Sequence, residues 1–273
     1  MMGFSFLTLP HSHLVKIVSL LDNLSNDEKG FLRKSGDITI DNGHYFIKEL
    51  RKERIIFPPD QYIKFYQEYY HKLNSAIETY PSYGMWCIDN KVFEVQPFIA
   101  NQSIMMRGTL LDWNTLKKTY TKILQDIDSV QRKYGTKDFS FVGIETAIWN
   151  FSTDGRLYDF NPVRLYNANC LFTTTNDPDM LEKTKFRNFS PFGMKVNLLA
   201  TVGIAVKNKD FILQNNPNNW FLELKSILRD NLKAQDSEKV DLLENQTDFP
   251  KWHPLQIINN FNRGGKKWIN IRI

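Results

Sequence analysis

The spacing of apolar residues predicts two helices in the first part of the chain. Residues 11–24 repeat apolar side chains at intervals typical of a helix that buries one face. A second repeat opens at Pro58 and continues for about five turns, since proline is tolerated in the first turn of a helix. Pro81 ends this second helix. Its apolar positions are Tyr62, Phe65, Tyr69 and Leu73.

Short apolar runs around the second helix predict β-strands instead. Residues 38–40 and 45–47 are two such runs, and the Asn42-Gly43 pair between them is a strong hairpin signal. An earlier run at 31–33 is separated from them by Ser35-Gly36-Asp37, which predicts a turn. After the helix, residues 85–88 and 92–95 form two more predicted strands. The first hundred residues thus combine an antiparallel sheet with two helices.

The second half of the chain is mainly helical in its periodicity. A long amphipathic helix begins after Asp112, a good N-cap residue, and ends at Gly135. Apolar and amphipathic stretches at 193–206 and 220–232 predict further helices. Between the long helix and the stretch at 193–206 we expect an extended segment at 139–144, then a hairpin of strands 147–151 and 157–160 around Thr153-Asp154-Gly155. The expected fold class is α+β, with a β-rich part at 1–100 and a helical part at 101–273.

Composition narrows the class of protein. A chain of 273 residues can bury a large core or form two lobes, and 42% hydrophobic with 24% charged residues excludes wholesale disorder. The two cysteines, Cys87 and Cys170, build no disulfide framework and lack metal-ligand spacing, which fits a reducing compartment. No targeting segment or bilayer-length apolar stretch stands out. We expect a soluble cytoplasmic protein with no membrane partner.

The stretch from Gly143 to Pro162 carries the most chemical information: it places Glu145, then Asn150, then a short turn and Asp159-Phe160. This order resembles the protein-kinase-like superfamily, above all its aminoglycoside and choline kinase branch, in which a catalytic loop ending in Asn precedes a hairpin that carries an Asp-Phe pair. The resemblance implies ATP and Mg²⁺ as cofactors. Asn150 and Asp159 would hold the metal, because Mg²⁺ prefers hard oxygen ligands.

The first hundred residues match the same family in order. Residues 45–48 resemble the strand whose lysine contacts the α- and β-phosphates, which makes Lys48 the candidate. The following helix offers Glu68 as the partner of Lys48. The segment with Gln96, Phe98 and Ile99 stands where the family's hinge receives the adenine. The resemblance therefore implies a two-lobed kinase-like fold with a β-rich N-lobe and a helical C-lobe.

Three positions depart from the family pattern. No glycine-rich phosphate loop is present, and Gly36 is the one glycine in the turn expected there. Glu145 stands five residues before Asn150, where the family has the Asp that orients the acceptor hydroxyl. The glycine of the family's Asp-Phe-Gly triplet is Asn161 here. These departures favour metal binding over turnover.

The leading hypothesis is phosphoryl transfer from ATP to a hydroxyl of a small molecule, such as an antibiotic, nucleoside or sugar intermediate, with Glu145 and Lys48 in catalytic roles. A protein substrate is disfavoured, since no Ala-Pro-Glu anchor follows the metal Asp. The alternative is a pseudokinase-like nucleotide-binding regulatory protein. A third hypothesis uses the basic end after Asp248 for nucleic acid, although a solvated tail explains it better. In the plainest interpretation, Asn150 and Asp159 flank an ordinary turn and Lys48 protects a strand edge.

Overall fold

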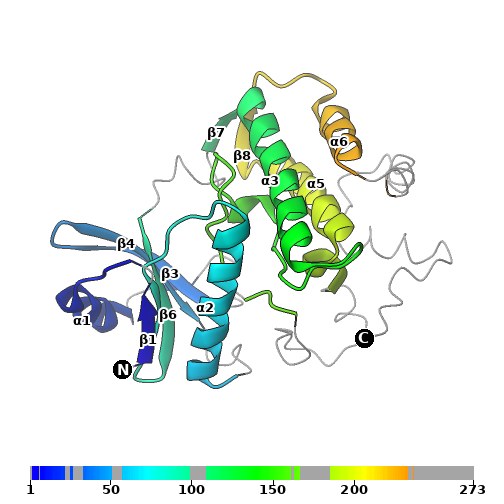
Figure 1. Ribbon diagram of the computed structural model, residues 1–273. Coiled ribbons are helices and arrows are strands. Elements are labelled where there is room, and N and C mark those ends of the chain that lie inside the picture. The colour runs from blue at the N-terminus through cyan, green and yellow to red at the C-terminus, as the bar shows by residue number, and fades with distance from the viewer. Residues whose placement is uncertain are drawn as a thin grey trace. The chain divides into compact units, whose positions relative to one another are not determined.

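The chain forms two compact units (Figure 1). The first comprises Met1–Ala100 and Leu157–Thr174, and the second comprises Asn101–Arg156 and Thr175–Ile273. The sequence predicts a division into 1–100 and 101–273, without the return of Leu157–Thr174 to the first unit. The computed structural model describes residues 2–5, 7–21, 25–26, 33–50, 57–98, 109–160, 163–166, 185–232 and 236.

The described part of the first unit contains a six-stranded antiparallel sheet in the order β1-β5-β6-β4-β3-β2. The sheet contains the predicted strands at 38–40, 45–47, 85–88 and 92–95, and two strands that were not predicted, Met2–Ser5 and Ser25–Asn26. The strands are β1 (Met2–Ser5), β2 (Ser25–Asn26), β3 (Arg33–Ile40), β4 (Gly43–Leu50), β5 (Gly84–Ile88) and β6 (Lys91–Pro97).

The β3–β4 hairpin confirms one turn prediction and contradicts another. The chain reverses at residues 41–42, where Asp41 adopts a left-handed φ of 53°, so the hairpin at Asn42-Gly43 is confirmed. The turn predicted at Ser35-Gly36-Asp37 is wrong, because these residues lie inside β3 and pair with β4. Gly36 is opposite Ile47 in this register, so it forms part of a strand and of no phosphate-binding turn.

Two helices pack against opposite faces of this sheet. The helix α1 (His11–Leu20) buries Leu14 and Ile17 in an apolar core with the odd-numbered β4 and β6 residues, including Ile47 and Val95. The helix α2 (Pro59–Ala76) contacts β5 and β1, and its Tyr66 reaches Glu94, the β6 residue next to Val95. Successive strand residues point to opposite faces, so α2 serves the face that carries the even-numbered side chains.

The second unit is built from helices that pack on one another. The longest, α3 (Trp113–Tyr134), begins where predicted, and the Asp112 side chain accepts hydrogen bonds from the backbone N–H groups of Asn114 and Thr115. It contacts α5 (Pro191–Asn208) and α6 (Trp220–Asp230), which confirm the other two predicted helices. A parallel pair of strands, which the sequence analysis does not predict, completes the regular elements: β7 (Thr109–Asp112) and β8 (Phe211–Gln214).

The hairpin predicted at 147–160 is wrong as a pair of strands. Residues Ile148–Asn150 form a 3-10 turn, η4, and a tight turn follows in which the Ser152 N–H donates to the Arg156 carbonyl at 2.9 Å. Gly155 takes a left-handed φ of 83° there. Beyond it, Leu157 forms a parallel bridge with Thr79 inside the first unit. Asn150 and Asp159 thus belong to different units and do not flank an ordinary hairpin.

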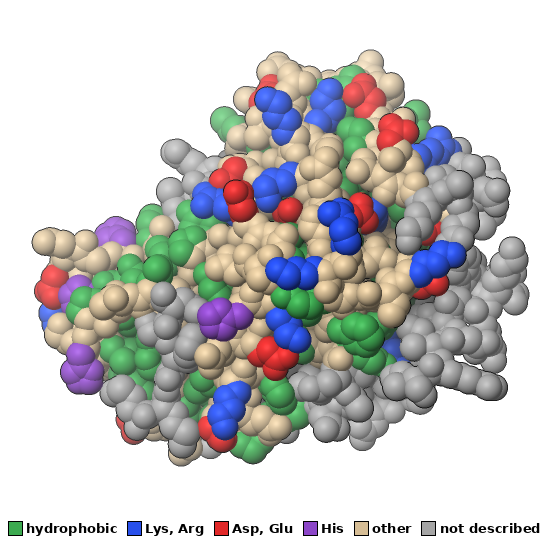
Figure 2. Space-filling model, viewed as in Figure 1, with side chains coloured by type: hydrophobic (Ala, Val, Ile, Leu, Met, Phe, Trp, Pro, Cys, Tyr) green, Lys and Arg blue, Asp and Glu red, His purple; other side chains and the backbone are tan. Residues whose placement is uncertain are grey.

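The mixed α and β class with an antiparallel sheet is confirmed. Within the described ranges, no helix has both the length and the apolar character needed to cross a membrane. On the face shown in Figure 2, the described basic and acidic side chains are interspersed. The ion pairs among the described residues include Lys122–Asp126, Lys117–Glu223 and Lys72–Glu68. The basic residues after Asp248 lie outside the described part of the chain.

Candidate functional site

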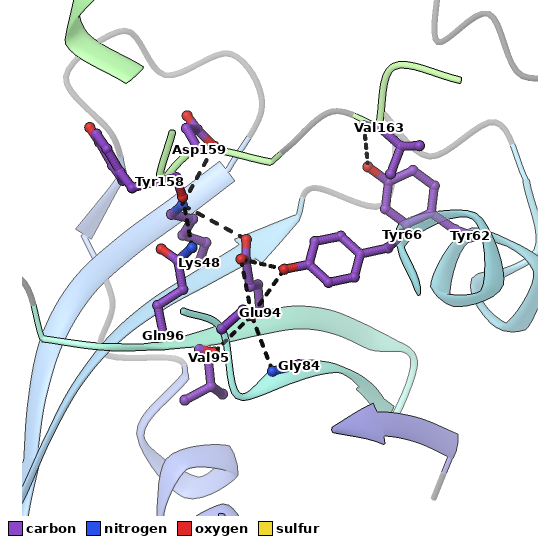
Figure 3. A network of polar contacts seen from close by, with 11 residues as sticks. Lys48, Tyr62, Tyr66, Gly84, Glu94, Val95, Gln96, Tyr158, Asp159 and Val163 are labelled. Carbon is purple, nitrogen blue, oxygen red and sulfur yellow. Dashed lines mark hydrogen bonds and ion pairs between the residues drawn. The ribbon is translucent and has the colours of Figure 1, made fainter. Parts of the chain in front are cut away.

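A fully buried lysine lies at the centre of the first unit's sheet. Lys48 projects from β4, which is hydrogen-bonded to β3 on one side and to β6 on the other, and its side chain is 0% exposed. Its Nζ lies 3.5 Å from Oδ1 of Asp159 and 3.8 Å from Oε2 of Glu94 (Figure 3). It also donates to the Tyr158 carbonyl at 3.2 Å and lies 5.2 Å from the centre of the Tyr158 ring. The interpretation of Lys48 as a strand-edge lysine is therefore wrong.

Glu94 is the carboxylate that the sheet itself supplies to Lys48. The two residues are directly opposite each other in the β4–β6 register, and both side chains are 0% exposed. The other carboxylate oxygen of Glu94 accepts a 2.5 Å hydrogen bond from the Tyr66 hydroxyl. Burial, and then the charge of Glu94, raise the pKa of Tyr66 well above its ordinary value. The tyrosine therefore stays protonated and keeps donating to the carboxylate.

The segment after Leu157 brings Asp159 onto the same face of the sheet. Gln96, two residues beyond Glu94 on β6, donates from Nε2 to the Tyr158 carbonyl at 2.7 Å. Further along, the Val163 N–H donates to the Tyr62 hydroxyl of α2 at 3.3 Å. These contacts fix the backbone on both sides of Asp159, whose side chain is 6% exposed. Lys48 and Asp159, 111 residues apart in the sequence, are thus brought together within one unit.

The predicted pairing of Lys48 with Glu68 is wrong. The Glu68 side chain is 49% exposed and pairs with Lys72 one turn further along α2, at 3.0 Å. The α2 residue that points toward the lysine site is Tyr66, which contacts Glu94. On a helix, residues two positions apart face different directions, so Glu68 and Tyr66 cannot share one contact. The sheet glutamate takes the place that the resemblance assigns to the helix.

The predicted hinge segment is described as far as Phe98. Gln96 and Pro97 end β6, Gln96 is 0% exposed, and the Phe98 N–H donates to the His44 carbonyl at 3.1 Å. The Gln96 side chain contacts the backbone before Asp159. Its Oε1 is buried, and it has no hydrogen-bond partner among the described residues. Ile99 lies outside the described residues.

Glu145 and Asn150 lie together in the second unit. The Asn150 side chain donates from Nδ2 to the Glu145 carbonyl at 3.2 Å, which closes the loop between them. The Ile148 N–H donates to the Thr201 hydroxyl of α5 at 3.1 Å and holds this loop on the helix. The Glu145 carboxylate forms a 2.8 Å ion pair with Arg187. Both candidate residues thus have defined positions within their own unit.

The described residues contain no group of three or more His, Cys, Asp or Glu side chains that could hold a metal on their own. The Asp159 carboxylate supplies hard oxygens of the kind Mg²⁺ takes when substrate phosphates complete its coordination. Asn150 belongs to the other unit, so its sharing a metal with Asp159 stays a prediction. Asn161 of the Asp-Phe-Asn triplet lies outside the described residues.

Sequence reasoning missed Glu94, Tyr66 and Tyr158. One signal for Glu94 was present: it is a charged residue inside an apolar strand, in Val92-Phe93-Glu94-Val95, as Lys48 is in the predicted strand at 45–48. Two opposite charges within neighbouring buried strands predict an ion pair, since an unpaired buried charge is costly. In comparisons with known proteins, no family model matches the chain, and no curated protein matches it.

Proposed function

We propose that this chain is a kinase-like phosphotransferase that uses ATP and Mg²⁺ to phosphorylate a hydroxyl group of a small molecule. The observation that carries the proposal is the fully buried Lys48 beside the carboxylate of Asp159, at 3.5 Å. In the kinase reaction a strand lysine binds the nucleotide phosphates and the Asp of an Asp-Phe pair binds Mg²⁺. Both residue types occur here in one unit, within an element order of lysine strand, helix and two strands.

The chemistry of each residue supports its proposed role. The Lys48 ammonium is a buried positive charge that can donate to phosphate oxygens in place of the Tyr158 carbonyl and Asp159. Asp159 would hold the metal through its carboxylate. Mg²⁺, when bound, neutralises charge on the phosphates as transfer proceeds. Gln96 fixes the position of Asp159 through the Tyr158 carbonyl.

The transfer step depends on residues of the second unit. We assign to Glu145 the orientation of the acceptor hydroxyl and to Asn150 the second metal contact, as the resemblance implies. Glu145 keeps a carboxylate beside the Arg187 guanidinium, at 2.8 Å. The two-lobed kinase-like arrangement is part of this proposal.

A second candidate is nucleotide binding without transfer, and two observations favour it. The Glu145 carboxylate is engaged by Arg187, which competes with an acceptor hydroxyl for the same oxygens. Gly36 lies within β3, so the described part of the sheet offers no glycine turn there to cover phosphates. A regulatory protein of this kind would keep the Lys48 and Asp159 contacts and lose only the rate.

The nucleotide site is tested by thermal shift with ATP and Mg²⁺, each alone and together. A ligand that binds only the native state stabilises it by about 2.7 kcal/mol at a hundredfold excess over Kd, and this raises the melting temperature. We expect the largest shift with both present, and none in Lys48→Met or Asp159→Ala protein shown to be folded by circular dichroism. The exposed Lys118→Met and Asp138→Ala variants are matched controls. A wild-type protein with no shift refutes the nucleotide site.

The choice between the two candidates depends on turnover. Release of ADP with a panel of hydroxylated small molecules should be measured for the wild type and for Glu145→Gln. A phosphotransferase loses most of its rate in this variant and keeps its nucleotide affinity. Nucleotide binding without ADP release, in both proteins and with every acceptor, identifies the regulatory alternative.

A further inference from the structure

We infer that Glu94 is the permanent counter-ion of Lys48, whereas Asp159 is an exchangeable partner that leaves the lysine when nucleotide and metal bind. The use of Lys48 for phosphates rests on the proposed function; the division between a fixed and an exchangeable carboxylate rests on the geometry of the first unit. Glu94 is thus a positioning residue, which acts on the nucleotide through the lysine.

The sheet fixes Glu94 against Lys48. The two residues are directly paired in the β4–β6 register, with Glu49 and Phe93 paired on one side of them and Ile47 and Val95 on the other. The ion pair therefore joins two hydrogen-bonded neighbouring strands of one sheet. The pairing of the two residues is thus set by the strand register, whereas the position of a helical glutamate would depend on α2.

Two hydroxyl groups hold the far oxygen of the Glu94 carboxylate. Oε1 accepts from Tyr66 at 2.5 Å and from Ser82 at 3.5 Å, while Oε2 faces Lys48 Nζ at 3.8 Å. Tyr66 and Ser82 are themselves 3.0 Å apart, and both are 0% exposed. The carboxylate is consequently held from both sides, by donors on one and by the ammonium on the other.

Asp159 is attached to the chain in a different way. It lies outside the helices and strands, on the segment between the Leu157 bridge and Val163, and its Oδ1 makes the 3.5 Å contact with Lys48. Turning the Asp159 carboxylate toward a cation gives up this 3.5 Å contact, whereas turning Glu94 away from Lys48 also gives up its hydrogen bonds with Tyr66 and Ser82. We therefore assign the exchange to Asp159.

Electrostatics explains why both carboxylates are present. A buried ammonium that loses its counter-charge is strongly unfavourable, because water no longer solvates it. If Asp159 were the sole carboxylate at Lys48, its transfer to a metal would leave the lysine without compensation until phosphate arrived. Glu94 stays beside Lys48 in either state, so the ammonium keeps a counter-charge when Asp159 leaves it.

The decisive comparison is Glu94→Gln against Glu68→Gln, the sheet and helix glutamates. Affinity for ATP and for adenosine is measured by calorimetry in the presence of Mg²⁺. We expect Glu94→Gln to weaken ATP binding about tenfold or more and to leave adenosine binding unchanged, because the lysine contacts phosphates alone. Glu68→Gln should match the wild type for both ligands. The inference is overturned if Glu94→Gln loses affinity for ATP and adenosine equally. It is also overturned if Glu68→Gln alone loses affinity for ATP.

A second measurement needs no nucleotide and separates this inference from the proposed function. Melting temperatures are compared for Lys48→Met, Glu94→Gln and the double variant. If Glu94 is the fixed counter-ion, the double variant melts higher than the sum of the single losses predicts. Additive losses overturn the inference even if ATP binds. Coupled losses in a protein that binds neither ATP nor adenosine uphold the fixed pair and refute the proposed function.

Discussion

The hydroxyl of Tyr66 offers a clean test of the buried network, because Tyr66→Phe removes one oxygen and keeps the ring. The ring is 0% exposed and packs edge-on against Phe160 and parallel to Tyr70, contacts that phenylalanine preserves. The lost group donates 2.5 Å to Glu94 and contacts Ser82 at 3.0 Å. Removal therefore deletes the hydrogen bond to a buried carboxylate together with the Ser82 contact, and it keeps the aromatic packing.

The expected loss follows from the charge of the acceptor. A hydrogen bond to a charged group contributes about 1.5–3 kcal/mol, and the carboxylate here keeps its second oxygen beside Lys48. We therefore expect Tyr66→Phe to lower the free energy of unfolding by about 2 kcal/mol, which corresponds to roughly 4–8 °C in Tm. Urea unfolding followed by circular dichroism measures the first quantity, and calorimetry measures the second.

Tyr120→Phe is the matched control. Tyr120 lies on α3, is also 0% exposed, and its hydroxyl has no hydrogen-bond partner among the described residues. Burial raises the pKa of both tyrosines, so each is a neutral phenol at working pH. Removing an unsatisfied hydroxyl is neutral or stabilising. If Tyr66→Phe costs no more than Tyr120→Phe, the contact with Glu94 does not stabilise the fold and our reasoning fails.

Two further predictions concern the second unit. Hydrogen bonds from Asn215 and from the first turn of α3 lower the pKa of Asp112. The stability that Asp112 contributes is present above its ordinary pKa and disappears as pH falls through the lowered value. The Tm difference between the wild type and Asp112→Ala should therefore be constant from pH 7 to about 5 and shrink in stronger acid. A Tm difference that acid does not change contradicts this prediction. In α5, alanine at Gly193 would place its Cβ 2.1 Å from the Phe186 carbonyl oxygen. The clash should outweigh the roughly 1 kcal/mol gain in helix propensity and lower the free energy of unfolding by about 1–3 kcal/mol. Urea unfolding measures this loss, and a Gly193→Ala variant as stable as the wild type refutes the prediction.

Local signals predicted the long helices and the β3–β4 hairpin of this chain well. Pro58 and Asp112 mark the starts of α2 and α3, and Asn42-Gly43 marks the β3–β4 turn, because caps and turns depend on neighbouring residues. Pairings between distant segments left no such signal. Strands β7 and β8 are about a hundred residues apart, and each is a short run that gains its conformation from the other. A short apolar run such as Ile148–Asn150 also fits a strand or a helical turn equally well, and tertiary contacts with α5 decide.

In the candidate site, too, one part was predicted correctly and another part, which depends on distant contacts, was not. Lys48 and Asp159 were predicted from their order along the chain, and the structure brings them within 3.5 Å. The partner of the lysine was predicted on the wrong element, since Glu68 is on the helix that follows the lysine strand and Glu94 is on a strand. Which of two glutamates reaches a lysine depends on strand register and helix rotation. Residue spacing along the chain determines neither the strand register nor the helix rotation. In this structure the helix residue that reaches the lysine site is Tyr66, through Glu94.

The chemical character of the two sheet faces argues that the buried charges serve function. One face of β4 and β6 packs Ile47 and Val95 against α1 in an apolar core, which shows that this sequence can stabilise the sheet with hydrocarbon side chains. The other face buries Lys48, Glu94 and Gln96 at 0% exposure. A buried ion pair is often no better for stability than apolar residues of similar size. Because apolar residues would serve the fold as well, the charged face is better explained by what a lysine with an exchangeable carboxylate can bind.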